Sequence, residues 1–144
     1  MKIIAAIAMV FFLAKGCGNE TAKDMQTAQI EYTANTRGFF QKLMVNNGVL
    51  SKSEDRNSDA RAEAINLSKE QSQELIVAFQ EINLEDLSDY KAPTEKRFYD
   101  GAAIGKLKIT YQGKTYESQE FDHGNPPVEI EKFVDKLQSF AKAE

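Results

Sequence analysis

His123 is the only histidine of this chain, and it follows Asp122 directly. A neighbouring carboxylate can orient an imidazole as a general base, which is the chemistry of many hydrolases. The sequence therefore allows a hydrolase that uses His123 with Asp122 and Asp100. The alternative is a structural histidine that bonds backbone groups and braces its loop, and we adopt this interpretation.

Other signatures of catalysis are missing from the sequence. The chain has serines but no G-x-S-x-G turn, and it has neither a P-loop nor a dinucleotide-binding glycine pattern. One histidine and one cysteine are too few for a zinc site of the usual Cys/His type. We therefore predict a noncatalytic protein that uses no metal and no cofactor.

Composition and charge indicate which classes of partner the protein can bind. Apolar residues make up 42% of the chain and charged residues 28%, the balance of a soluble globular protein with a packed core. The net charge is -4, and the basic residues form no stripe. Because phosphate neutralisation supplies most of the affinity for nucleic acids, we predict no nucleic-acid partner.

The longest stretch without helical or strand periodicity runs from Tyr90 to Ala103. Loops of this length are uncommon unless they have a function, and a basic pair with an aromatic ring can hold an anionic or peptide partner. The alternative is that Arg97 pairs with Asp100 or Asp122 while Phe98 fills the edge of the core. The candidate binding residues here are Lys96, Arg97, Tyr99 and Asp100.

A second candidate contact is the segment Arg37-Gly38-Phe39-Phe40. Adjacent residues in a strand point to opposite faces of a sheet, so at least one of the two phenylalanine rings can lie on the surface. Arg37, Phe39 and Phe40 are therefore candidate binding residues, with core packing of both rings as the alternative.

The N-terminus indicates export. Lys2 precedes an uninterrupted apolar run from Ile3 to Ala14, which is shorter than the roughly 20 residues that span a bilayer and fits a signal peptide. Gly16 lies directly before Cys17, the only cysteine. This arrangement resembles bacterial lipoprotein signals, which implies a diacylated cysteine as the first mature residue.

The predicted organisation is a signal peptide over 1–16, a lipid-anchored flexible tether over 17–27 and one domain over 28–144. Lipoprotein signals usually have Leu three residues before the cysteine, whereas this chain has Ala14 there, so cleavage by the ordinary signal peptidase is the alternative. We favour lipidation, because it explains a single exported cysteine. The expected location is the periplasmic face or the surface of a bacterial cell envelope.

Turn and strand signals predict two hairpin regions. Asn47-Gly48 favours a type I′ turn, and we expect strands near 28–36, 39–46 and 49–54. A further pair, 104–111 and 115–122, alternates apolar and polar residues around Gln112-Gly113-Lys114. Whether 62–66 adds a strand is left open.

Two helices follow from capping and periodicity. Ser68 and Gln71 form a capping box that begins a helix over about 69–82, and Asn125-Pro126-Pro127 begins the last helix. The order of elements predicts an α+β fold, β-β-β-α-β-β-α, with both helices on one face of an antiparallel sheet. The apolar stripe of the last helix consists of Ile130, Phe133, Val134, Leu137 and Phe140.

Four segments of the mature region resemble small uncharacterised bacterial lipoproteins. They are Arg37-Gly38-Phe39-Phe40, Ala92-Pro93-Thr94-Glu95-Lys96-Arg97-Phe98, Tyr99-Asp100-Gly101-Ala102 and Phe121-Asp122-His123-Gly124-Asn125-Pro126-Pro127. The chain also resembles emfourin-type inhibitors of thermolysin-like metalloproteases in its aromatic glycine turn, its late strand pair and its proline-led last helix. That resemblance implies a fold and, as an alternative function, protease inhibition. It carries over no inhibitory residues.

Together these features predict a noncatalytic domain, anchored to a membrane through Cys17, that binds a protein or peptide. The loop from Tyr90 to Ala103 and the turn from Arg37 to Phe40 are the expected contact regions.

Overall fold

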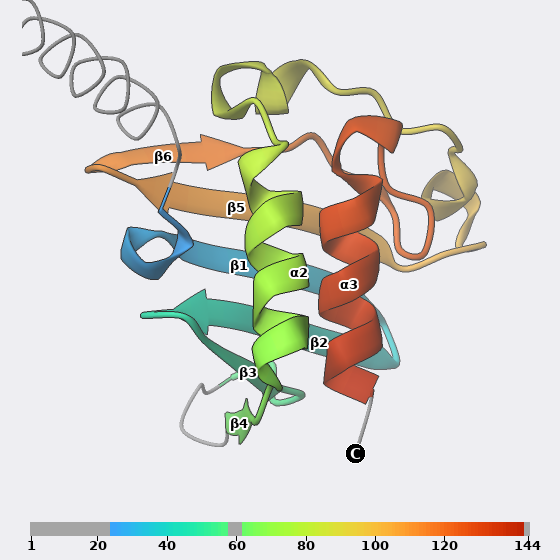
Figure 1. The fold of residues 1–144 in the computed structure, drawn as a ribbon. Helices are drawn as coiled ribbons and strands as arrows, with labels where there is room; N and C mark the ends of the chain where they lie inside the picture. The colour runs from blue at the N-terminus through green and yellow to red at the C-terminus, as the bar shows by residue number, and fades with distance from the viewer. Residues whose placement is uncertain (1–23, 58–61, 143–144) are drawn as a thin grey trace, which may run out of the picture.

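The computed structural model describes residues 24–57 and 62–142, and its fold is shown in Figure 1. The predicted signal peptide, Cys17 and the first part of the predicted tether lie outside the described residues. An antiparallel sheet of seven strands carries two main helices, which confirms the predicted α+β class. Both helices cover the same face of the sheet (Figure 1).

The first three strands are β1 (Gln29–Thr36), β2 (Phe39–Asn46) and β3 (Val49–Ser53). Asn47 and Gly48 have φ values of 53° and 75°, so the predicted type I′ turn is confirmed. The short strand β4 (Glu63–Ile65) pairs with β3, which answers the question left open for this segment.

The second hairpin differs from its prediction in one strand. Strand β5 (Ile104–Tyr111) is as expected, whereas the predicted strand 115–122 is split into β6 (Lys114–Glu117) and β7 (Phe121–Asp122). The Ser118 hydroxyl accepts a hydrogen bond from the Leu107 amide at 2.9 Å and donates to the Gln119 carbonyl at 2.9 Å. A side chain thus replaces a backbone acceptor of the ladder, and the strand is interrupted there.

The spatial order of the strands is β4-β3-β2-β1-β5-β6, with β7 also pairing with β5. Strand β1 therefore lies in the middle of the sheet, between β2 and β5. Its residues Ile30, Tyr32 and Ala34 point toward the helices and are buried, as the alternation of a half-covered strand requires.

The first main helix, α2 (Lys69–Gln80), begins with the predicted capping box. The Ser68 hydroxyl accepts from the Gln71 amide at 3.1 Å, and the Gln71 side chain accepts from the Ser68 amide at 2.9 Å. The helix ends two residues earlier than predicted, and a 3-10 helix, η3 (Leu84–Asp89), follows it. Helix α3 (Glu131–Lys142) comes after a 3-10 turn, η5 (Val128–Ile130), and all five residues of its predicted stripe are buried.

The start of the domain differs from the prediction. Residues Met25–Thr27 form a 3-10 turn, η1, and Met25 is only 2% exposed. The Asp24 carboxylate accepts from the Gln26 amide at 2.9 Å and caps this turn. The prediction of a flexible tether reaching residue 27 is therefore wrong for its last four residues, because the buried Met25 side chain and a hydrogen bond from the Asp24 amide to the Tyr111 hydroxyl, at 3.1 Å, hold this turn against the domain.

No helix among residues 24–57 and 62–142 is long and apolar enough to cross a membrane.

Candidate functional site

Most of the predicted contact residues lie at one end of the sheet. Asn35, near the end of β1, pairs with both Phe40 and Ile104. The β1–β2 turn and the loop that leads into β5 therefore lie at the same end. The chain enters β1 at Gln29, which is the opposite end of this strand (Figure 1).

Part of the predicted loop is a short helix. Residues Lys96–Tyr99 form a 3-10 helix, η4, within the segment from Tyr90 to Ala103 that lacked sequence periodicity. Its N-cap residue, Glu95, makes no side-chain capping bond. A four-residue helix does not form by itself in water, because its few hydrogen bonds do not offset the cost of ordering the chain. Contacts from elsewhere in the fold must hold it.

Asp122 makes those contacts. Its carboxylate is 2% exposed and accepts hydrogen bonds from the Lys96 amide at 2.8 Å and from the Arg97 amide at 2.9 Å. It also accepts from the Thr94 hydroxyl and, at 3.2 Å, from Nη1 of Arg97. A carboxylate 26 residues away along the chain thus caps the first amides of η4 in place of the local N-cap.

The pKa of Asp122 reflects these four hydrogen bonds. Burial alone would raise the pKa, but the bonds from Thr94, from the amides of Arg97 and Lys96 and from the Arg97 side chain outweigh it and lower the pKa to about 2. The group is therefore an anion at neutral pH, and its four donors leave it no free acceptor position toward His123.

Arg97 is held on two sides. Its Nη1 donates to the Thr94 carbonyl at 2.8 Å as well as to Asp122, and its guanidinium carbon lies 4.4 Å from the centre of the Phe98 ring. Of the two predicted partners of Arg97, Asp122 is therefore the right one. Asp100 instead ends η4 in a left-handed conformation, with φ of 61°.

The aromatic residues of η4 point into solvent. Phe98 is 70% exposed and Tyr99 is 73% exposed, so the prediction that Phe98 fills the edge of the core is wrong. The Lys96 side chain is also exposed. We call the residues Lys96–Tyr99 the aromatic knob.

His123 faces away from Asp122. Its Nδ1 lies 2.8 Å from the hydroxyl of the buried Tyr32, and its ring centre lies 5.6 Å from that of Phe39. Its backbone amide donates to the Ala103 carbonyl at 2.9 Å. The ring therefore braces a buried tyrosine and not backbone groups as predicted. Burial, and then the charge of Lys142, lower the pKa of His123.

The structure thus does not form the Asp122–His123 dyad on which a hydrolase would depend. The two side chains are neighbours along β7 and its extension and point to opposite sides, as alternation requires. Among the described residues, no three His, Cys, Asp or Glu side chains gather in a group that could hold a metal ion.

The two phenylalanines after the first turn also point to opposite sides. Phe39 is 40% exposed and contacts His123, whereas Phe40 is half-buried on the other face under the guanidinium of Arg56, 5.6 Å from its ring centre. The alternative that both phenylalanine rings pack in the core is therefore wrong. The exposed Arg37 follows directly on β1.

Arg56 is a residue of this region that the sequence analysis did not identify. Its Nη2 donates to the Thr36 carbonyl at 2.6 Å and to the Phe39 carbonyl at 3.1 Å, which fixes the ends of β1 and β2 around the turn. Arg56 belongs to a polar loop, and no spacing in the sequence connects it to a turn 17 residues earlier.

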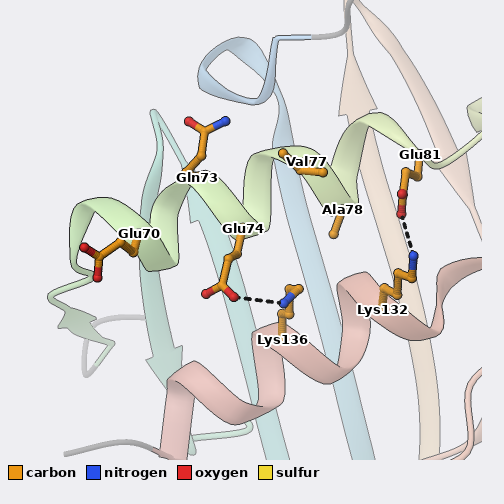
Figure 2. A pocket seen from close by; sticks show the side chains of 8 residues that line it. All are labelled: Glu70, Gln73, Glu74, Val77, Ala78, Glu81, Lys132 and Lys136. Carbon is orange, nitrogen blue, oxygen red and sulfur yellow. Dashed lines mark ion pairs between the residues drawn. The ribbon is translucent and has the colours of Figure 1, made fainter.

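A groove between α2 and α3 is a second surface that the sequence did not indicate (Figure 2). Its volume is about 710 Å³, and two ion pairs cross it, Lys132–Glu81 at 3.6 Å and Lys136–Glu74 at 3.5 Å. Val77 on its rim is 47% exposed. The acidic groups belong to α2 and its C-cap residue, Glu81, and the basic ones to α3, so the charges of this groove are largely paired within the molecule.

Comparison of the chain with protein-family models, with curated proteins and with solved structures finds no match. The resemblances to lipoproteins and to emfourin-type inhibitors therefore remain predictions.

Proposed function

We propose that this protein is a lipid-anchored protein of the bacterial cell envelope, attached through Cys17, and that its noncatalytic domain binds a protein or peptide through the aromatic knob. The observation that carries the proposal is the exposure of two adjacent aromatic rings, 70% for Phe98 and 73% for Tyr99, on a helix that a buried carboxylate holds in place.

Exposed aromatic side chains favour binding when their backbone is already ordered. Tyrosine and arginine are enriched among the residues that dominate protein interfaces, and aromatic rings bury much apolar surface at a small cost in side-chain entropy. In this protein the ordering of the loop is part of folding, because Asp122 caps η4 in the free domain. A partner therefore does not have to order it.

The position of the aromatic knob agrees with an anchor at Cys17. The chain enters the domain at Asp24, beside the first residues of β1, and the knob lies beyond the other end of this strand (Figure 1). At about 3.3 Å per residue, the eight residues of β1 separate the two ends by roughly 25 Å. The anchored domain can therefore present the knob away from its attachment point.

Site-specific crosslinking tests the binding proposal. A photoreactive phenylalanine analogue replaces Tyr99 in one variant and Val77, in the α2–α3 groove, in a control variant. We expect irradiation of the producing cells to give one discrete covalent adduct at position 99, absent at position 77 and lost when Phe98→Ala is added. The same set of adducts at both positions would contradict the proposal.

Detergent-phase partitioning tests the anchor. Acylation makes the wild-type protein partition into the detergent phase, and Cys17→Ser removes the acceptor thiol, so we expect this variant in the aqueous phase. Ser139→Ala, at an exposed position in α3, is the control. An unchanged distribution of the Cys17→Ser variant would favour ordinary signal-peptidase cleavage or retention of the apolar segment.

The exposure of Phe98 and Tyr99 also suits the alternative of an emfourin-like inhibitor, because binding clefts are lined largely by apolar and aromatic side chains. Incubation of the protein with a thermolysin-like protease separates the two functions. Inhibition at micromolar concentration that is lost with Phe98→Ala would favour the inhibitor, and full protease activity would exclude it.

A further inference from the structure

The guanidinium of Arg97 has unused hydrogen-bond donors. An arginine side chain offers five N–H groups in a fixed plane. Nη1 donates to the Thr94 carbonyl and to Asp122, whereas Nε is buried and has no partner. Nη2 makes no hydrogen bond to any described residue, although the side chain as a whole is only 10% exposed.

The guanidinium of Arg97 is held in one orientation by the groups that it already contacts. Asp122 and the Thr94 carbonyl hold the Nη1 side, and the guanidinium carbon lies over the Phe98 ring, 4.4 Å from its centre. The Nε–H and one Nη2–H point in the same direction from the opposite edge. Two parallel N–H groups at this spacing match the two oxygens of a carboxylate, which arginine often binds in this bidentate manner.

We propose that the Nε–Nη2 edge of Arg97 binds a carboxylate supplied by the partner, next to an aromatic or apolar group that contacts Phe98. This inference rests on the proposed function and specifies its partner: a protein surface or peptide with an Asp, Glu or C-terminal carboxylate beside an apolar side chain. Phe98 lies outside the core cluster and is 70% exposed, so its ring is available to an apolar group of a ligand bound beside Arg97.

The exposed Lys96 adds a second positive charge beside this edge, and it forms no ion pair within residues 24–57 and 62–142. Asp122 neutralises one charge of the pair Lys96 and Arg97, which leaves this pair with one positive charge. Glu95 and Asp100 are close in the chain and oppose any anion. They oppose a doubly charged phosphate about twice as strongly as a singly charged carboxylate, which favours the carboxylate.

Nuclear magnetic resonance of the full chain with isotope-labelled arginine, in a non-ionic detergent, tests the inference. Sodium benzoate is the aromatic carboxylate probe, sodium acetate the plain carboxylate, sodium phosphate the competing anion and sodium chloride the control for ionic strength. Arg97→Lys identifies the Nε–H resonance of Arg97 and keeps a positive charge without the paired donors.

We expect the Nε–H resonance of Arg97 to move downfield and saturate with benzoate and acetate in the millimolar range, and to stay in place with chloride. Contact with Phe98 should make benzoate bind about threefold to tenfold more tightly than acetate, and Phe98→Ala should remove this difference. The resonance of Arg56, whose Nη2 is already bonded, is the internal control.

A resonance that does not move, or moves equally with chloride, would overturn the inference, as would tighter binding of phosphate than of acetate. Crosslinking at position 99 separates this result from the proposed function. If Arg97→Lys leaves the adduct at full yield, the partner does not use this edge and the carboxylate site is rejected, whereas binding through the aromatic rings stands. An adduct yield reduced about tenfold or more in Arg97→Lys, with the fold intact, would support the carboxylate site.

Discussion

Asp122 lies in the two-residue strand β7, between the core and the loop that carries the aromatic knob. Its charge is balanced by one guanidinium and stabilised by two amides and a hydroxyl, so burial of the carboxylate is compensated by bonds that also order the loop. One side chain therefore connects the stability of the domain to the shape of its proposed binding surface.

Replacement of Asp122 by asparagine should lower the stability of the domain. The amide side chain keeps one acceptor oxygen but places an NH₂ group against amide donors and leaves Arg97 without its counter-charge. We expect a loss on the order of 2 to 3 kcal/mol in the free energy of unfolding, measured by urea denaturation. Asp89→Asn, at an exposed carboxylate, should change it by less than about 0.5 kcal/mol.

The pH dependence of the unfolding free energy of the same variants tests whether the lost charge of Asp122 causes the loss of stability. Because the folded pKa of Asp122 is about 2 and its ordinary value is 3.8, the carboxylate contributes stability that is complete above about pH 4 and is lost as the pH falls toward 2. The difference between wild type and Asp122→Asn should shrink over this range. A difference that stays constant down to pH 2 would show that lost packing, and not lost charge, explains the effect.

His123 should titrate below its ordinary value of 6.5, because burial and Lys142 lower its pKa. Its neutral form contributes stability above about pH 6.5, and this contribution is lost as the pH falls through the lower folded pKa. Proton chemical shifts of the imidazole ring measure the titration. In Lys142→Gln one of these two causes is removed, so the pKa of His123 should rise toward 6.5; a fall would contradict this assignment.

At the scale of elements, two helix starts show two different ways to cap a helix. In α2 both capping partners, Ser68 and Gln71, lie within three residues of each other, so the start of this helix is encoded locally. In η4 the local N-cap makes no side-chain bond, and the acceptor comes from β7. The first helix should therefore tolerate changes elsewhere in the fold, whereas the second depends on the sheet.

Ser68→Ala should cost about 1 kcal/mol of unfolding free energy, because it removes the acceptor for the Gln71 amide. Ser139→Ala, at an exposed position in α3, is the matched control, and alanine's higher helix propensity should leave that variant unchanged or slightly more stable. Thermal or urea unfolding followed by circular dichroism measures both. Equal losses in the two variants would argue against the capping role.

At the scale of the whole molecule, the helices and the sheet share one core, and Met25, the second described residue, already belongs to it. Met25 is buried together with Ala28, Ile30 and the residues of α2 and β5. The turn η1 contacts α2, so the segment that leads into the domain also contacts a helix. An anchored tether would therefore end before Asp24 and not at Thr27 as predicted.

Chains that begin at Asp24 and at Ala28 should therefore differ in stability. Removal of residues 24–27 exposes the Met25 site, and we expect a loss of about 1 to 3 kcal/mol, measured by urea denaturation of the two truncated proteins. Met25→Ala in the longer chain should reproduce most of this loss. Identical stabilities would mean that the turn η1 does not contribute to the core.

Much of the fold could be predicted from local patterns, because those patterns act over a few residues. Asn47-Gly48 defines a turn through its positive φ values, Ser68 and Gln71 define a helix start, and the stripe of α3 follows from the helical period. The interruption at Ser118 was missed, since a hydroxyl competing with a ladder acceptor leaves no mark on the alternation.

By itself, the sequence determined the α+β class, the two main helices, the strands β1, β2, β3 and β5, and the residue types available for a contact surface. Only the tertiary structure decided which of those residues act together: Asp122 with η4, His123 with Tyr32, and Arg56 with the β1–β2 turn. The reason is that these contacts join residues 17 to 91 positions apart. The register of the sheet determines which of these residues meet, and the residues next to them in the sequence do not indicate it.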